Sequence, residues 1–95
     1  IGILHTGDQL KENNMKIHYC AMFDDKEMSY HGEFEVQANP YQIREQKDRV
    51  IGAAIGFLKK KCEEEFNTDF KKLKFFEVYF YEDKKEVQIF KKIKQ

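Results

Sequence analysis

The chain has 95 residues, enough for one small domain, and its 17 basic and 17 acidic side chains leave no net charge. This balance disfavours a polybasic nucleic-acid arm and a strongly acidic mimic of DNA. Hydrophobic residues make up 41% of the chain and include nine phenylalanines and five tyrosines, which is typical of a folded core rather than of a disordered chain. No apolar run approaches the ~18 residues that a membrane-spanning helix requires.

Residues 1–14 mix polar and apolar side chains without a clear period, and we expect them to form an N-terminal arm. The first methionine is Met15, so this arm is native, processed or added to the natural chain. Its opening residues are too few for the apolar region of a secretory signal. Two cysteines, Cys20 and Cys62, are too few for a disulfide-stapled secreted domain and predict reduced thiols in the cytoplasm. Residues 15–95 are expected to form a single α+β domain.

Two stretches of alternating apolar and polar residues, 15–23 and 28–38, flank the polar segment 24–27. A period of two predicts strands, and the polar break predicts a hairpin with one apolar and one solvated face. A turn centred on Asp25 and Lys26 fixes which residue of one strand lies opposite which residue of the other. Cys20 then lies opposite His31, and His18 lies opposite Glu33.

Asn39 and Pro40 predict the start of a helix, because Asn is a good N-cap and Pro suits the first helical turn. Residues 40–66 continue with helical spacing, which predicts one apolar stripe made of Ile43, Val50, Ala54, Phe57, Leu58, Cys62 and Phe66. At ~1.5 Å per residue this run would be ~40 Å long, more than the sheet beneath it, so its first turns are expected to project or kink. Gly52 and Gly56 inside the run predict close packing of the helix on the sheet.

A second hairpin is predicted from strands at 72–82 and 86–93, with a turn centred on Asp83 and Lys84. This turn assigns five residues to the core face, namely Phe76, Val78, Phe80, Val87 and Ile89. It assigns an aromatic group and a lysine to the opposite face, namely Phe75, Tyr79, Tyr81, Phe90 and Lys92.

The element order is therefore ββαββ, an α+β fold in which one long helix packs on one face of a four-stranded sheet. The β-grasp arrangement of small binding domains has the same element order, so the predicted fold is β-grasp-like in this respect. Residues 1–40 carry a net charge of −4 and residues 71–95 a net charge of +4. A sheet built from both hairpins should therefore have an acidic part and a basic part.

The aromatic group on the face opposite the helix needs an explanation, because a one-layer sheet exposes that face to water. Three explanations remain open: the N-terminal arm covers it, it binds a protein or a second copy of the chain, or it stacks unpaired bases. For a protein partner, the expected anchors are Phe75, Tyr79, Tyr81 and Phe90, and the expected steering charges are Lys92 and Lys94.

The first hairpin gathers residue types that bind zinc or activate a thiol. His18, Cys20 and His31 could act together as metal ligands, and Cys20 with His31 resembles a nucleophile and its base. A shift of one residue in the strand register would separate them. The sequence has no P-loop, no paired Cys-x-x-Cys and only three Ser or Thr residues, so we expect no enzyme.

The sequence thus favours a small cytoplasmic, non-catalytic module that binds another protein, of which an inhibitor of a larger protein or complex is one form. We expect it to dock through the aromatic face of the second hairpin, through an exposed strand edge, or through both. The alternative is a single-stranded nucleic-acid-binding domain that uses the same aromatics and the C-terminal lysines. A zinc or thiol site on the first hairpin is the third reading. A homodimer is also open, and no cofactor and no membrane contact are expected.

Overall fold

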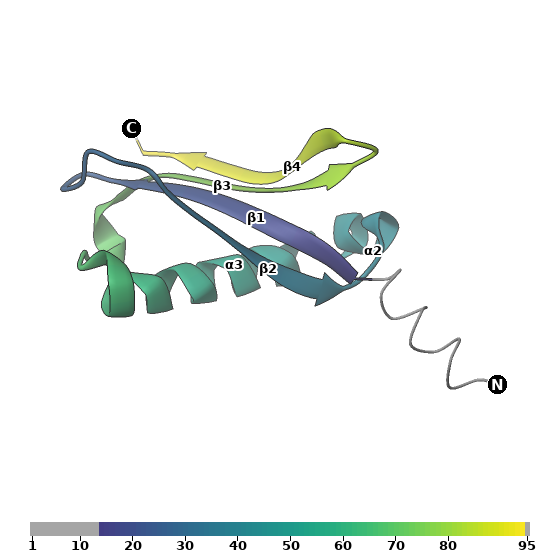
Figure 1. Ribbon diagram of the computed structural model, residues 1–95, viewed down its shortest axis with the longest axis horizontal. Coiled ribbons are helices and arrows are strands. Elements are labelled where there is room, and N and C mark those ends of the chain that lie inside the picture. Colours follow the sequence, from purple (N-terminus) through teal and green to yellow (C-terminus); the bar gives the residue numbers. More distant parts are fainter. Residues whose placement is uncertain (1–13, 95) are drawn as a thin grey trace.

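The computed structural model describes residues 14–94 and contains one four-stranded antiparallel sheet with the strand order β2-β1-β3-β4. Its strands are β1 (Asn14–Phe23), β2 (Tyr30–Gln37), β3 (Leu73–Glu82) and β4 (Lys85–Ile93). Its helical segments are α2 (Pro40–Glu45), α3 (Lys47–Lys61), η1 (Cys62–Phe66) and η2 (Phe70–Lys72). Figure 1 shows α3 running along one face of the sheet. The predicted α+β fold and its ββαββ order are confirmed.

The first hairpin has the predicted register. Eight residue pairs join β1 to β2 without a break, and they include Cys20 opposite His31 and His18 opposite Glu33. The second strand begins at Tyr30, two residues later than predicted, because Met28 lies in the connecting turn. The arm predicted over residues 1–14 lies outside the described residues, except for Asn14, which starts β1.

The helix begins as predicted and then bends. The Asn39 side chain accepts a hydrogen bond from the Gln42 backbone N–H at 2.8 Å, and the Gln42 side chain accepts one from the Asn39 N–H at 2.9 Å, which forms a capping box. Gln46, with φ −115° and ψ 37°, interrupts the helix between α2 and α3. This break is the expected kink, and it lets both segments contact the twisted sheet. The chain leaves the helix through Asn67, which is left-handed with φ 51°.

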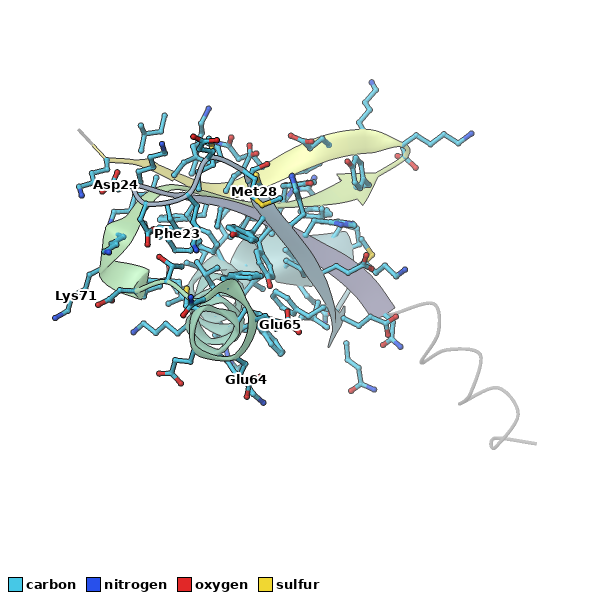
Figure 2. The ribbon with its side chains drawn as sticks, turned by 60° about the vertical axis from the view of Figure 1, so that its left-hand side comes forward. Phe23, Asp24, Met28, Glu64, Glu65 and Lys71 are labelled. Atoms are coloured by element: carbon cyan, nitrogen blue, oxygen red, sulfur yellow. The ribbon has the colours of Figure 1, made fainter. Side chains whose placement is uncertain are left out.

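The core lies between the helix and the sheet, where Figure 2 shows the fully buried Phe23. The helix contributes Ile43, Val50, Ala54, Leu58 and Cys62 to it, all from the predicted apolar stripe. The expectation for Gly52 and Gly56 is wrong. Both face solvent, and a Cβ atom at either position would meet nothing within 4 Å. The small residue that the helix buries in the core is Ala54 instead.

The close approach occurs on the sheet, at Gly32. The buried ring of Tyr19 on β1 lies across Gly32 on β2, so close that a Cβ at residue 32 would stand 2.3 Å from the ring Cζ atom. Beside this contact, Phe34 stacks on Phe57 of α3 with ring centroids 4.8 Å apart. Glycine is therefore required at residue 32 by the Tyr19 ring and not by backbone strain.

Candidate functional site

The face of the sheet that points away from α3, called the outer face here, carries the candidate site. Figure 1 shows that no helix of residues 14–94 lies on this face. The register brings β1 and β3 together in its centre, with His18 opposite Tyr79 and Cys20 opposite Glu77. The outer face is therefore formed by side chains from both hairpins, as predicted for a single sheet.

Three rings, His18, Tyr79 and Tyr81, form a cluster that we call the outer aromatic cluster. The His18 ring stacks on Tyr79 with centroids 5.4 Å apart and meets the edge of Tyr81 at 5.3 Å. Tyr79 and Tyr81 contact each other edge to face at 5.8 Å. Tyr79 is partly buried, and this burial raises the pKa of its hydroxyl. Tyr81 keeps 47% of its surface exposed. The cluster thus combines one partly buried ring with one that a partner can reach.

Phe75 occupies the same face, farther along β3. The Lys91 ammonium lies 5.8 Å from the centre of the Phe75 ring, within the range of a cation–π contact. Ile93 pairs with Phe75 across the strands and is 60% exposed. The outer face therefore has a second apolar area at the opposite end from Tyr81.

The predicted position of Phe90 is wrong. The register of β3 and β4 shifts between Val78 and Tyr79, which leaves Ile89 as an extra residue on β4. Such a β-bulge turns two consecutive side chains to the same side. Ile89 and Phe90 consequently both face the helix, and Phe90 contacts the Phe76 ring with centroids 6.2 Å apart. Phe90 belongs to the edge of the core and is no anchor on the outer face.

The two lysines that were expected to steer a partner, Lys92 and Lys94, do not lie beside the outer aromatic cluster with unpaired charges. Lys92 pairs with Phe76 and so lies on the helix side of the sheet, while Lys91 takes the place on the outer face. The Lys94 ammonium forms an ion pair with Asp24 at 2.7 Å. Neither predicted lysine stands beside the aromatic residues with a free charge.

The metal and thiol candidates separate into two groups. The Cys20 Sγ atom lies 3.9 Å from His31 Nε2, and that nitrogen lies 3.2 Å from the Ser29 hydroxyl. His18 instead faces the tyrosines. Among residues 14–94, no group of three or more His, Cys, Asp or Glu side chains is arranged to hold a metal ion. The predicted register is right, but it does not bring the three candidate ligands to one point.

The thiol itself is not activated. Burial raises the pKa of Cys20, and the nearby Glu77 carboxylate raises it further. A thiol with a raised pKa stays protonated at neutral pH and is a weaker nucleophile. The Cys20–His31 contact therefore has the geometry of a nucleophile and base without the electrostatics.

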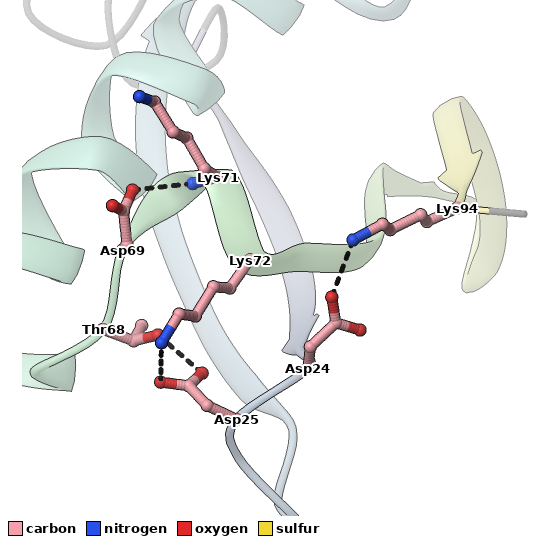
Figure 3. Close-up of polar contacts among 7 residues, drawn as sticks. All are labelled: Asp24, Asp25, Thr68, Asp69, Lys71, Lys72 and Lys94. Atoms are coloured by element: carbon pink, nitrogen blue, oxygen red, sulfur yellow. Dashed lines mark hydrogen bonds and ion pairs between the residues drawn. The ribbon is translucent and has the colours of Figure 1, made fainter.

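A polar network that the sequence analysis did not identify holds one end of the molecule together (Figure 3). The Thr68 hydroxyl donates to Asp25 Oδ1 at 2.7 Å and lowers the pKa of that carboxyl, and Lys72 lies 3.5 Å from the other Asp25 oxygen. The Asp24 N–H donates to the Lys72 carbonyl at 2.8 Å. An open pocket of about 630 Å³ adjoins this network. Since its charges are paired with one another, we assign it to the anchoring of the first turn.

Comparisons with protein-family models, with curated proteins and with solved structures find no match to this chain. No helix in the described part of the chain is long and apolar enough to cross a membrane.

Proposed function

We propose that this chain is a small, non-catalytic module that binds another protein through the outer face of its sheet. The observation that carries the proposal is the outer aromatic cluster, which lies on a face that no helix of residues 14–94 covers (Figure 1). Tyrosine is enriched at protein interfaces because one ring contributes a large apolar area and a polar hydroxyl. Residues that dominate binding energy are commonly aromatic and centrally placed, as Tyr79 is on β3.

The charges on the outer face favour a protein over a nucleic acid. The register places four glutamates and two lysines there, namely Glu33, Glu35, Glu77, Glu86, Lys16 and Lys91. A surface that stacks unpaired bases needs cations along the phosphate path. Here the carboxylates outnumber the cations around the rings, so a phosphate backbone would be repelled.

The side chains of the first hairpin also favour a binding role over a catalytic one. The protonated Cys20 thiol offers no activated nucleophile, and the described residues offer no metal group. A cytoplasmic location is part of the proposal, supported by two free cysteines, one on the outer face and the other in the core. Inhibition of a larger protein is one function that such a module would serve.

The proposal is tested by affinity capture from cell lysate with the whole chain as bait, with and without nuclease. Tyr79→Ala should weaken binding of the captured protein by about 2 kcal/mol, or roughly thirtyfold, and should leave the domain folded. Tyr41→Ala is the matched control, because Tyr41 is 67% exposed on α2, away from the outer face. It should leave binding unchanged.

Three outcomes would contradict the proposal. Retention that disappears with nuclease and declines steeply with salt would establish the nucleic-acid alternative. Equal binding by Tyr79→Ala and the unsubstituted chain would remove the outer face from the interface. Unfolding of Tyr79→Ala, detected by circular dichroism, would place Tyr79 in the core and not in a binding surface.

A further inference from the structure

The two edges of the sheet, β2 and β4, differ in how they are protected. An edge strand presents unpaired N–H and C=O groups that can pair with another chain. Edge lysines and a β-bulge are two common ways to block such pairing. β4 has both, because Lys85, Lys91 and Lys92 lie along it and its register with β3 is interrupted. The β4 edge is therefore closed to further strands.

The β2 edge has none of these protections. Its eight residues pair with β1 in one uninterrupted register, and they include no lysine, arginine or proline. Among residues 14–94, no backbone hydrogen bond joins β2 to any strand other than β1. A regular edge of eight residues is long enough to pair with an extended segment.

The two faces of β2 specify what such a segment must carry. On the helix side, Tyr30, Phe34 and Val36 are half-buried and border the core. On the outer side, Glu33 and Glu35 are exposed. Lys16 pairs with Glu33 at 3.2 Å, whereas Glu35 has no ion-pair partner in the described part of the chain. An added strand would therefore meet mainly apolar side chains on one side. On the other side it would meet Glu33 and Glu35 at the centre of a row that His31 and Gln37 complete.

We infer that β2 binds, by strand addition, an extended segment of a partner protein in which apolar residues alternate with lysine or arginine. The inference rests on the proposed function, since it takes the chain to be a protein-binding module, and it names the partner's chemistry. A second copy of this chain fits less well. Two β2 strands side by side would bring Glu33 and Glu35 of both copies together, and the opposite edge of the described sheet, the lysine-bearing β4, is blocked by its bulge.

The probe is a synthetic eight-residue peptide that alternates lysine with valine, titrated into the isotope-labelled full chain and followed by backbone amide NMR. The matched control peptide has the same composition with its lysines grouped at one end, so that total charge is equal. The alternating peptide should shift the β2 amides, slow their hydrogen exchange and bind at least tenfold more tightly than the grouped peptide.

Charge reversal on the protein gives the second arm. The double substitution Glu33→Lys and Glu35→Lys should weaken the alternating peptide about tenfold or more, because opposite charges become like charges across the strands. Glu86→Lys on β4 is the matched control and should change affinity less than twofold. If the double reversal lowers the melting temperature, Glu33→Gln with Glu35→Gln replaces it, with a several-fold loss expected.

Each remaining outcome overturns the inference in a distinguishable way. Equal binding of both peptides would show nonspecific attraction only. Shifts confined to the outer aromatic cluster would move the site to the outer face and would leave the proposed function standing. Concentration-dependent protection of the β2 amides without peptide, together with a dimer in sedimentation, would identify a second copy as the occupant. Loss of lysate capture by Tyr79→Ala, with capture retained by the double reversal, would uphold the proposed function and reject the edge.

Discussion

The contact between Tyr19 and Gly32 leads to a sharp prediction, because the same substitution should have opposite effects at two glycines. Gly32→Ala places a methyl group 2.3 Å from both Cζ and Oη of the Tyr19 ring. Tyr19 is only 3% exposed, and its ring lies 6.2 Å from that of Phe76, centroid to centroid. The ring therefore has to move within a packed core or push β2 away from β1.

The magnitude follows from two opposing effects. Overpacking of a core typically costs about 1–3 kcal/mol. Replacing glycine within a strand recovers about 0.5–1 kcal/mol, because alanine loses less backbone entropy on folding. We therefore expect Gly32→Ala to lower the free energy of unfolding by roughly 1–2 kcal/mol, with a fall in Tm of about 5 °C or more.

Gly56→Ala on α3 is the matched control. A Cβ at residue 56 meets no atom within 4 Å, so only the helix propensity changes. Alanine is favoured over glycine within a helix by about 1 kcal/mol, and Gly56→Ala should stabilise the domain by about that amount. Urea unfolding of both variants, followed by circular dichroism, measures the two changes directly.

A double-mutant cycle tests the cause. In a Tyr19→Leu background the ring atoms that would collide with the methyl group are absent, so Gly32→Ala should cost at least 1 kcal/mol less than in the unsubstituted chain. If Gly32→Ala instead stabilises the domain as Gly56→Ala does, the Tyr19 ring does not occupy this position. The steric explanation for glycine at residue 32 would then be wrong.

Three further predictions concern the turns and the titratable groups. Lys84→Gly should stabilise the domain by about 0.5 kcal/mol in urea unfolding, because Lys84 is left-handed with φ 65°. The Thr68 hydroxyl lowers the pKa of Asp25 in the folded state, so the Asp25 carboxylate stabilises the fold above its unfolded pKa of about 4 and loses this effect as the pH falls. Thr68→Val should therefore reduce the loss of folding stability between pH 5 and 2. Burial raises the pKa of Cys62 and Tyr19, so their neutral forms favour folding up to about pH 8.5, and the urea midpoint should fall between pH 8.5 and 11.

The two hairpins were predictable from local signals. Side chains that alternate along a strand must lie on opposite faces, so the pattern alone identified the strands and, except beyond the bulge at Ile89, their core sides. The turn at Asp25 and Lys26 then set the register, and the structure has Cys20 opposite His31 as expected. The helix start was equally local, since the Asn39 cap and Pro40 act within one turn.

The candidate site was only partly predictable. The positions of Tyr79 and Tyr81 on the outer face followed from the turn at Asp83, because their pairing continues that register for four residues. Beyond that point the bulge at Ile89 reversed the faces, so Phe90 moved to the core side and Lys91 replaced Lys92. A bulge leaves no clear mark in a run of consecutive apolar residues, since either side chain could face the core.

What the sequence by itself determined is the order of the elements, the first register and most of the buried stripe of the helix, because each depends on residues within a turn or a strand repeat. Only the tertiary structure decided that Gly32 and not Gly52 lies at a close contact, and that His18 joins the tyrosines rather than Cys20. It also decided which edge of the sheet is unprotected. These features depend on how two distant hairpins share one twisted sheet, and packing between segments far apart in the chain has no period that a sequence can display.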